Sequence, residues 1–465
     1  MNNTTNMKAV KDIEVVSKTE RIEFKERVSF GIGDFGTNLM YALMVTFLTY
    51  FYTNVVGISA ALTGTIMFGA RVLDGILNLI VGTLMDRTDT KHGKARPWIL
   101  WTAIPFGLTG FLMSTIPNIG YNGKVAYVII TYLLANIFFQ ANNIPYGSLV
   151  SLITRDTYER SVLSIFRNFF STIGSMTVGI VTLPLIAFLG NTQKAWIITF
   201  GVYGFLTSLC LIITFLGTKE RVKPVRANNK EKFTFSQVVY AVKKNKYWAM
   251  IFAYLFITFV TMTAVSTVNV YYAEYILKNP MIVSFISLAQ SLPAFLVLFI
   301  ISPLIRRFGK RNIALLGLSI SLIGYLLPLI DKNSVSLLII ATVLKGIGGA
   351  PIGATMFAFL ADTIDYGEWV SGLRIEGILF SAGTLGQTLG MGVGTALVGW
   401  ILGAVGFASG SQIQNENVIT TIALIFIFLP AILTIINIII LMFYKLENIF
   451  EKISADLSIG KLREK

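Results

Sequence analysis

The sequence predicts an all-α membrane protein with twelve transmembrane helices arranged as two six-helix bundles. Only 13% of its 465 residues are charged and 54% are hydrophobic, whereas soluble domains carry about 25% charged residues. Apolar stretches of roughly 18 residues or more recur along the whole chain, and each can cross about 30 Å of hydrocarbon. The strands of a membrane β-barrel would be shorter and would alternate in polarity, so helices are predicted.

A long basic loop divides the apolar stretches into six and six, which suggests two similar halves. We therefore predict a 1–28 N-terminal segment, a 29–216 first bundle, a 217–246 central loop, a 247–444 second bundle and a 445–465 tail. The twelve predicted helices cover residues 29–53, 61–85, 98–116, 125–149, 161–189, 195–216, 247–277, 281–305, 312–330, 336–361, 375–405 and 418–444.

The distribution of lysine and arginine predicts the orientation. On this helix assignment, 31 of the 38 basic residues fall on the side that carries both termini, and only four fall in the opposite loops. The positive-inside rule then places both termini in the cytoplasm of a cell that holds this protein in its plasma membrane. Topology also explains the net charge of +14, so we expect a bilayer and no nucleic acid as partner.

The sequence holds few of the residues that nucleophilic catalysis or metal binding needs. The chain holds one cysteine, Cys210, and one histidine, His92. A nucleophilic triad or a histidine-based metal site would need more of these residues. We expect neither an enzyme nor a bound cofactor, and the longest loop is too short for the soluble domain of a sensor.

Asp74 is an acid inside an apolar helical run, where a carboxylate costs several kcal/mol on most scales. Arg71, Asp74 and Asn78 are spaced i, i+3 and i+7, so they share one face of the helix. A static ion pair of Asp74, either with Arg71 or with a basic group on another helix, is one interpretation. We favour a role in cation coupling for Asp74 and Asn78, because neutral side chains would fill a purely structural position at lower cost.

Amide side chains in two helices suggest ligand contact. Asn38 lies in the first helix, and Asn143 lies in the fourth just before Pro145. An amide both donates and accepts hydrogen bonds, which suits a hydroxyl-rich ligand. The alternative is that these amides join helices to one another, as amides often do in membranes.

Basic residues inside the spans suggest a positive interior. Arg167 lies in the fifth helix, and Lys345 lies about 14 Å deep in the tenth at 1.5 Å per residue. Together with Arg71 they give three positive charges within the spans, and Asp74 gives one negative charge. This excess of positive charge favours a substrate with a carboxylate, such as a uronide. Arg167 can instead extend to the surface, and Lys345 can instead pair with Asp74.

Charged residues near the cytoplasmic ends predict a gate that latches the inner face shut in one state. The alternative is a solvated loop that only sets topology, but topology needs only the bases. The predicted gate residues are Asp86, Arg87, Lys94 and Arg96 in the first half, and Asp365, Glu368 and Arg374 in the second.

Four motifs carry a resemblance to a known family. They are DRTDTKHGKARPW at 86–98, ADTIDYGEW at 361–369, FYTNVVG at 51–57 and NIPY at 143–146. With them the chain resembles, over nearly its whole length, the glycoside–pentoside–hexuronide:cation symporters of the major facilitator superfamily, which include the melibiose permease. The resemblance implies a major facilitator fold, alternating access, and uptake of a sugar or glycoside with Na⁺, Li⁺ or H⁺.

The resemblance also assigns roles to individual positions. Asp74 matches an acid of the family's cation site, and Asn78 matches a second acid there. Asn38 and Asn143 match two acids that hold the sugar, Arg167 matches an arginine near it, and Thr388 lies near the position of a lysine. One acid of four is kept and the lysine is absent, so melibiose itself is not expected.

The sequence therefore predicts a monomeric sugar importer that is driven by a cation. The predicted substrate-binding residues are Asn38, Asn143, Arg167, Lys345 and Thr388. A proton is favoured over Na⁺, because a Na⁺ site needs several oxygen ligands and the second acid is replaced by Asn78. Two alternatives stay open: an uncoupled sugar facilitator, and a carrier of an amphipathic lipid-like solute, which would have a mainly apolar cavity.

Overall fold

The computed structural model describes residues 22–154, 156–222, 240, 242–373, 376–411, 413–458 and 462. Nearly all of these residues are helical, which confirms the all-α prediction. Within the described residues, β pairing is limited to an isolated bridge between Thr90 and Gly93. Eleven of the helices found there are long and apolar enough to cross a membrane.

The first bundle begins with α2 (Phe24–Thr46), which continues through α3 (Leu48–Tyr50) into a short π-helix, η1 (Phe51–Val55). Its other helices are α4 (Ala60–Arg87), α5 (Arg96–Ser114), α6 (Tyr121–Ile153), α7 (Thr157–Phe188) and α8 (Gln193–Gly217). Helix α2 takes the place of the first predicted span, and its first turns carry the charged residues Lys25, Glu26 and Arg27.

The second bundle consists of α10 (Lys246–Tyr275), α11 (Ile282–Phe308), α12 (Lys310–Leu326) with the 3₁₀ turn η2 (Leu327–Leu329), α13 (Val335–Ser371), α14 (Glu376–Ala404) and α15 (Glu416–Phe443). A last helix, α16 (Glu447–Ser458), follows in the tail. The predicted end of the tenth helix at residue 361 is wrong by ten residues, because α13 continues to Ser371 through three acids that the sequence analysis assigned to a loop.

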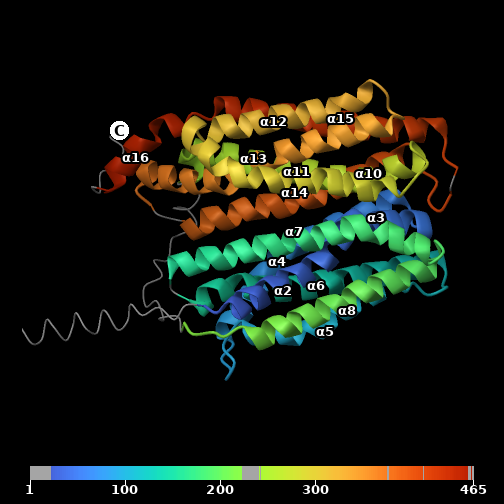
Figure 1. Cartoon of the computed structure of the whole chain (residues 1–465), viewed down its shortest axis with the longest axis horizontal. Coiled ribbons are helices and arrows are strands. Elements are labelled where there is room, and N and C mark those ends of the chain that lie inside the picture. The colour runs from blue at the N-terminus through green and yellow to red at the C-terminus, as the bar shows by residue number, and fades with distance from the viewer. Residues whose placement is uncertain are drawn as a thin grey trace, which may run out of the picture.

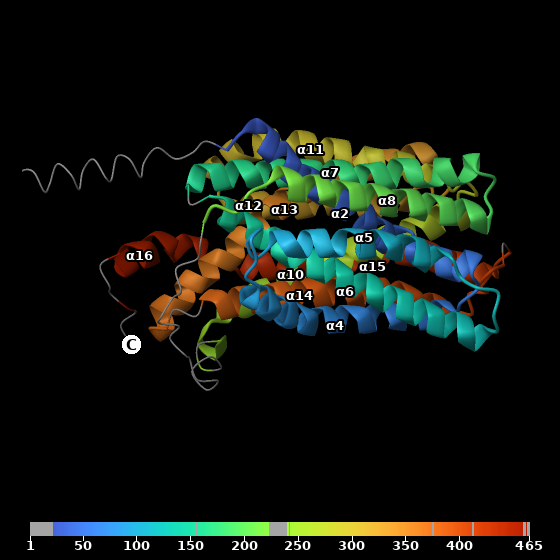
Figure 2. The ribbon, with the colours of Figure 1, turned by 90° about the horizontal axis from the view of Figure 1, so that it is seen from below.

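The helices lie side by side along the long axis of the molecule (Figures 1 and 2). In the first bundle α2 packs against α7 and α8, and α5 against α6 and α8. In the second, α10 packs against α14 and α15, and α12 against α13 and α15. The bundles meet where α4 contacts α14 and α7 contacts α11. This confirms two six-helix bundles, whereas the segment boundaries given above stay predictions.

One end of the molecule carries the start of α2 and helix α16, and we call it the terminal end; the other is the far end (Figure 1). At the far end the bundles are in intimate contact. A Cβ atom on Gly399 of α14 would lie 2.6 Å from the carbonyl oxygen of Ala60 in α4. Only glycine permits this approach, so the two backbones seal the far end.

Hydrogen bonds add to this seal. The Thr53 and Tyr271 hydroxyls lie 2.7 Å apart. The amide of Asn54 donates to the Tyr275 hydroxyl at 2.6 Å. Each pair joins η1 of the first bundle to α10 of the second, so the far end is closed in this structure.

Two ion pairs at the terminal end each join helices of the same bundle. Arg27 and Glu159 lie 2.9 Å apart and link α2 to α7. In the second bundle, Lys310 of α12 pairs with Asp362 of α13. Each bundle is therefore held together at this end by its own charges.

Candidate functional site

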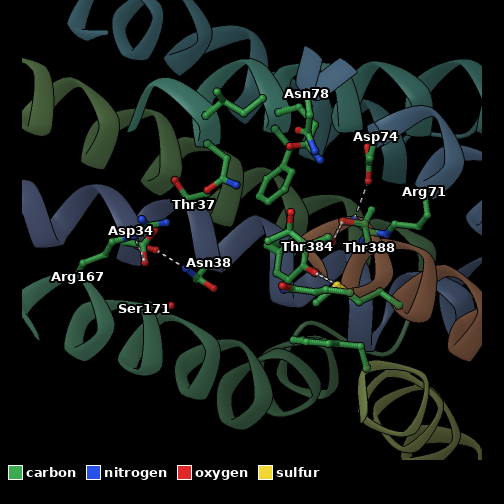
Figure 3. Close-up of a pocket in the computed structure, with 18 of the residues that line it drawn as sticks. Asp34, Thr37, Asn38, Arg71, Asp74, Asn78, Arg167, Ser171, Thr384 and Thr388 are labelled. Carbon is green, nitrogen blue, oxygen red and sulfur yellow. Dashed lines mark hydrogen bonds and ion pairs between the residues drawn. The ribbon is translucent and has the colours of Figure 1, made fainter. Parts of the chain in front are cut away.

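A cavity of about 680 Å³ lies between the bundles, in their middle (Figure 3). Helices α2, α4, α6 and α7 form one wall, and α10, α13 and α14 form the other. The residues that line it are Asp34, Thr37, Asn38, Tyr41, Arg71, Asp74, Asn78, Phe139, Gln140, Asn143, Ile144, Arg167, Asn168, Ser171, Phe259, Met356, Phe357, Thr384, Gln387, Thr388 and Met391.

Both predicted cation-coupling residues and four of the five predicted substrate-binding residues line this one cavity. They come from five helices, and the four charged residues of the lining all belong to the first bundle. The second bundle contributes amide, hydroxyl, thioether and aromatic groups. The cavity therefore has a charged wall and a neutral wall.

Asp74 is fully buried and forms an ion pair with Arg71 one turn before it in α4. Arg71 Nη1 donates to Asp74 Oδ2 at 3.1 Å, and the exposed fraction of Asp74 is 0%. Gln140 lies beside this carboxylate, but the buried Oδ1 atom makes no hydrogen bond of ordinary geometry with any described residue. The protein thus pairs one oxygen of Asp74 with Arg71, whereas the other has Gln140 beside it without a hydrogen bond of ordinary geometry.

Arg71 also connects the ion pair to the far-end side of the cavity. Its guanidinium carbon lies 5.4 Å from the ring centroid of Tyr41. The Tyr41 hydroxyl in turn donates to the sulfur of Met391 on α14 at 2.9 Å. Arg71 and Tyr41 thus connect Asp74 to a contact between the two bundles.

Asp34 is a functional candidate that the sequence analysis missed. It lies on α2 in the cavity wall, and Asp34 Oδ2 is 3.5 Å from Nε of Arg167 on α7. Ser171 lies beside it, and Arg167 also covers the Tyr146 ring at 5.2 Å. The signal was present, because Asp34 is an acid within the first predicted helix, as Asp74 is within the second.

The prediction of a positive interior is wrong for this cavity. Its two acids, Asp34 and Asp74, are paired with its two arginines, Arg167 and Arg71 (Figure 3). The charges balance in pairs, so the inference of a carboxylate-bearing substrate loses its physical basis.

Lys345, which was predicted to bind the substrate, is absent from the lining of this cavity. It is only 3% exposed. Its ammonium lies over two rings inside the second bundle, 4.9 Å from Phe426 and 5.6 Å from Tyr325. Depth along a helix, which the sequence gives, does not determine which neighbours a side chain faces.

The amides divide into two groups. Asn142 joins helices, because its Oδ1 atom accepts from Thr37 at 3.3 Å and its amide donates to Thr102 at 3.1 Å. Asn38 donates to the backbone oxygen of Asp34 at 2.8 Å and lines the cavity. Asn143 lines the cavity and makes no hydrogen bond among the described residues, so its amide is available to a ligand.

The predicted gate residues of the first half lie at the terminal end. The backbone amides of Lys94 and Arg96 donate to Glu220, and the Arg96 guanidinium donates to the Phe215 carbonyl at 2.6 Å. These contacts hold the loop after α4 against the end of α8, within the first bundle. Arg87 is exposed.

The other gate residues belong to two groups. Asp365 and Glu368 lie on α13 rather than in a loop. Arg374 and the side chain of Asp86 fall outside the described residues. A latch between bundles therefore stays a prediction.

Comparison with known proteins decides the family. A profile described as MFS/sugar transport protein matches residues 29–448 of the chain. The chain belongs to this family. Its resemblance to the glycoside–pentoside–hexuronide:cation symporters of the major facilitator superfamily is thereby confirmed, and it is a multi-pass membrane protein of a family of sugar transporters.

Relatives in this sugar transporter family match over almost their full length. The chain is 32% identical to the isoprimeverose transporter of Lactiplantibacillus pentosus, over 94% of this chain and 91% of that protein. It is 29% identical to a putative glycoside/cation symporter of Escherichia coli, YagG, over 92% and 93%. The inward-open xylose transporter XylE from E. coli shares the fold, with a TM-score of 0.62, 14% identity, and coverage of 93% and 98%.

Proposed function

We propose that this sugar transporter imports a neutral glycoside by proton symport, with alternating access to one central cavity. The observation that carries the proposal is the cavity itself. It lies between two bundles that are sealed at one end, and it combines free amide groups with a buried acid that is incompletely hydrogen-bonded.

The distribution of basic residues indicates which conformational state of the transport cycle this structure represents. The basic loops favour the terminal end as the cytoplasmic one, so the sealed far end faces the outside. In this state the outer side is closed, and a solute in the cavity leaves toward the cytoplasm. Uptake needs the opposite state, in which the far-end contacts open and the predicted gate at the terminal end closes.

The lining favours a hydroxyl-rich solute over a lipid-like one. Of its 21 residues, 14 are charged or carry an amide or an aliphatic hydroxyl, whereas a carrier of an amphipathic lipid would need a mainly apolar wall. A volume of about 680 Å³ is typical of small-molecule sites. A similar protein is named for isoprimeverose, so we include this glycoside among the substrates to test first.

Substrate recognition is assigned to groups of both walls. Asn143 offers a free donor and acceptor from α6, and Thr388 offers a hydroxyl from α14. The Asp34–Arg167 pair presents both an acceptor and a donor, which together suit adjacent hydroxyls of a sugar. A solute that bridges α6 and α14 draws the bundles together, and this links binding to the change of state.

Asp74 is assigned the coupling role. A proton on its carboxyl group weakens the ion pair with Arg71 and thereby the contact of Arg71 with Tyr41. Na⁺ is less suited to this site, because the Arg71 guanidinium already lies 3.1 Å from the carboxylate and repels a second cation. Asn78 lies in the same wall and supplies a further oxygen if Na⁺ does bind.

The experiment is uptake into proteoliposomes that contain the purified chain. Isoprimeverose, a β-glucoside and a glucuronide are compared with an imposed pH gradient, with a Na⁺ gradient and with neither. We expect accumulation of a neutral glycoside above its external concentration only with the pH gradient. Equilibration without accumulation would instead support the uncoupled facilitator, which a permanently paired Asp74 would favour.

A pair of amide variants tests the site. Asn143→Ala should weaken uptake about tenfold, the loss expected for about 1.4 kcal/mol of hydrogen bonding to the solute. Asn312→Ala removes an exposed amide of α12 that lies outside the cavity lining and donates to the carbonyl oxygen of Phe308 at the end of α11, and it serves as the control. Equal uptake by the two variants would remove Asn143 from the site.

A further inference from the structure

A second cavity, of about 370 Å³, lies at the far end of the molecule, away from the central site. Its lining includes Tyr50 of α3 and Trp196 of α8 from the first bundle. Glu274 and Tyr275 of α10, with Ser411 in the loop after α14, come from the second. We call it the outer cavity. It shares Asn54 and Tyr275 with the far-end seal, and none of its residues is assigned to substrate binding or cation coupling above.

The outer cavity combines aromatic rings with one acid. Tyr50, Trp196 and Tyr275 contribute rings, and Glu274 is the only charged residue of the lining. The Tyr50 hydroxyl lies beside the Glu274 carboxyl, yet the buried Glu274 Oε2 makes no hydrogen bond with the described residues. A carboxylate without a full set of donors, next to ring faces, suits a ligand that has hydroxyl donors on its edge and an apolar C–H face.

Neutral polar groups complete the lining. Asn191 lies at the rim in a left-handed backbone conformation, with φ of 55°, which asparagine tolerates better than most residues. Its side chain is exposed and offers both a donor and an acceptor. The cavity is much larger than a single ion, and one carboxylate is too few for a metal that needs several oxygen ligands.

The cavity depends on the closed far end. Asn54 donates to Tyr275 across the bundles at 2.6 Å, and the Tyr275 hydroxyl donates to the carbonyl oxygen of Ser411 at 3.3 Å. The backbone amide of Gly410 donates to the carbonyl of Thr53 at 2.9 Å. Opening of the far end would separate Asn54 from Tyr275 and Gly410 from Thr53, so the complete lining exists only in the closed state.

We propose that the outer cavity is a second glycoside site, which binds one sugar ring from the medium and, by bridging both bundles, holds the far end closed. The chemical class of the ligand and the outward position of this site rest on the proposed function. A ligand that binds only the closed form shifts the population toward it. External glycoside at high concentration then slows the return to the outward-open state and inhibits its own uptake.

Fluorescence of Trp196 gives a direct test on the purified full-length chain, with methyl β-glucoside as the probe. The fluorescence change assigned to Trp196 is the part that is lost in Trp196→Phe. Trp101→Phe, which replaces an exposed tryptophan on α5, is the control and should keep that change. We expect a saturable response in the wild type that survives in Asn143→Ala. Glu274→Gln should weaken the apparent affinity about tenfold, because a charged hydrogen-bond acceptor is lost. Should Glu274→Gln fail to fold, Asn191→Gly keeps the positive φ and removes the amide, and we expect a weaker response there too.

Three results would overturn the outer site. One is the absence of any Trp196 response to the glucoside. Another is a response that Asn143→Ala abolishes and Glu274→Gln leaves unchanged, which would place binding in the central cavity alone. The third is a Trp196 response to choline and not to the glucoside, which would make the site one for organic cations. Uptake in proteoliposomes is measured separately. Uptake without a Trp196 response would mean a sugar transporter that has the central site alone, and absence of uptake would contradict the proposed function itself.

Discussion

Substitution of Asp74 and Arg71, singly and together, separates a structural ion pair from a coupling site. The two charges lie 3.1 Å apart, and the carboxylate is fully buried. Removing one partner of a buried pair costs about 3–5 kcal/mol, because the other charge stays buried and unpaired. Asp74→Asn should therefore lower thermal stability by about that free energy, and the Tyr41 ring beside Arg71 places the cost at the lower end.

The double variant Arg71→Gln/Asp74→Asn should recover most of this loss. It replaces two opposite charges by two amides that can still hydrogen-bond, and neutral replacement of a whole buried pair is often without net cost. Stability is measured as thermal unfolding of the purified chain in detergent. Transport is measured both as exchange of glycoside without a gradient and as accumulation driven by a pH gradient.

If Asp74 carries the proton, both Asp74→Asn and the double variant lose accumulation, while the double variant keeps exchange and stability. Recovery of proton-driven accumulation in the double variant would refute the coupling role and leave Asp74 as a structural partner of Arg71. Normal accumulation by Asp74→Asn alone would do the same.

Three further predictions concern recognition and gating. Arg167→Lys keeps the charge but loses the planar guanidinium, so the KM for glycoside should rise about tenfold with the accumulation ratio unchanged; an altered ratio would give Arg167 a coupling role. Gly399→Val places a branched side chain against the α4 backbone and should keep the far end open. The open state is measured as faster alkylation of a reporter cysteine introduced by Asn54→Cys. Unchanged alkylation would show that closure does not require contact between α4 and α14. Thr53→Val removes the 2.7 Å hydrogen bond to Tyr271, worth about 1 kcal/mol, and should shift the same reporter about fivefold toward the open form; a shift toward protection would contradict the far-end seal.

Six of the site residues predicted from the sequence line one cavity, but the criterion that selected them was incomplete. Asn38, Asn143 and Thr388 are polar residues within apolar runs, and such residues often line an interior. Lys345 met the same criterion and is enclosed by rings of the second bundle instead. The criterion finds residues that avoid lipid, but it does not tell a cavity wall from a helix contact.

The sequence by itself determined that the chain crosses a membrane many times, that it forms two sets of six helices, and that it holds a single histidine and a single cysteine. These properties depend on local quantities, which are the length of each apolar run, the placement of the basic loops and the types of residue present.

Only the tertiary structure decided which charges meet. Asp34 and Arg167 are 133 positions apart, and they pair because α2 packs against α7. Lys345 misses the cavity, and α13 runs on past Ala361, for the same kind of reason, since the neighbours of a helix face are set by packing between distant segments. A buried charge is stabilised by the partner that the fold brings to it, and no pattern within a single helix contains that partner.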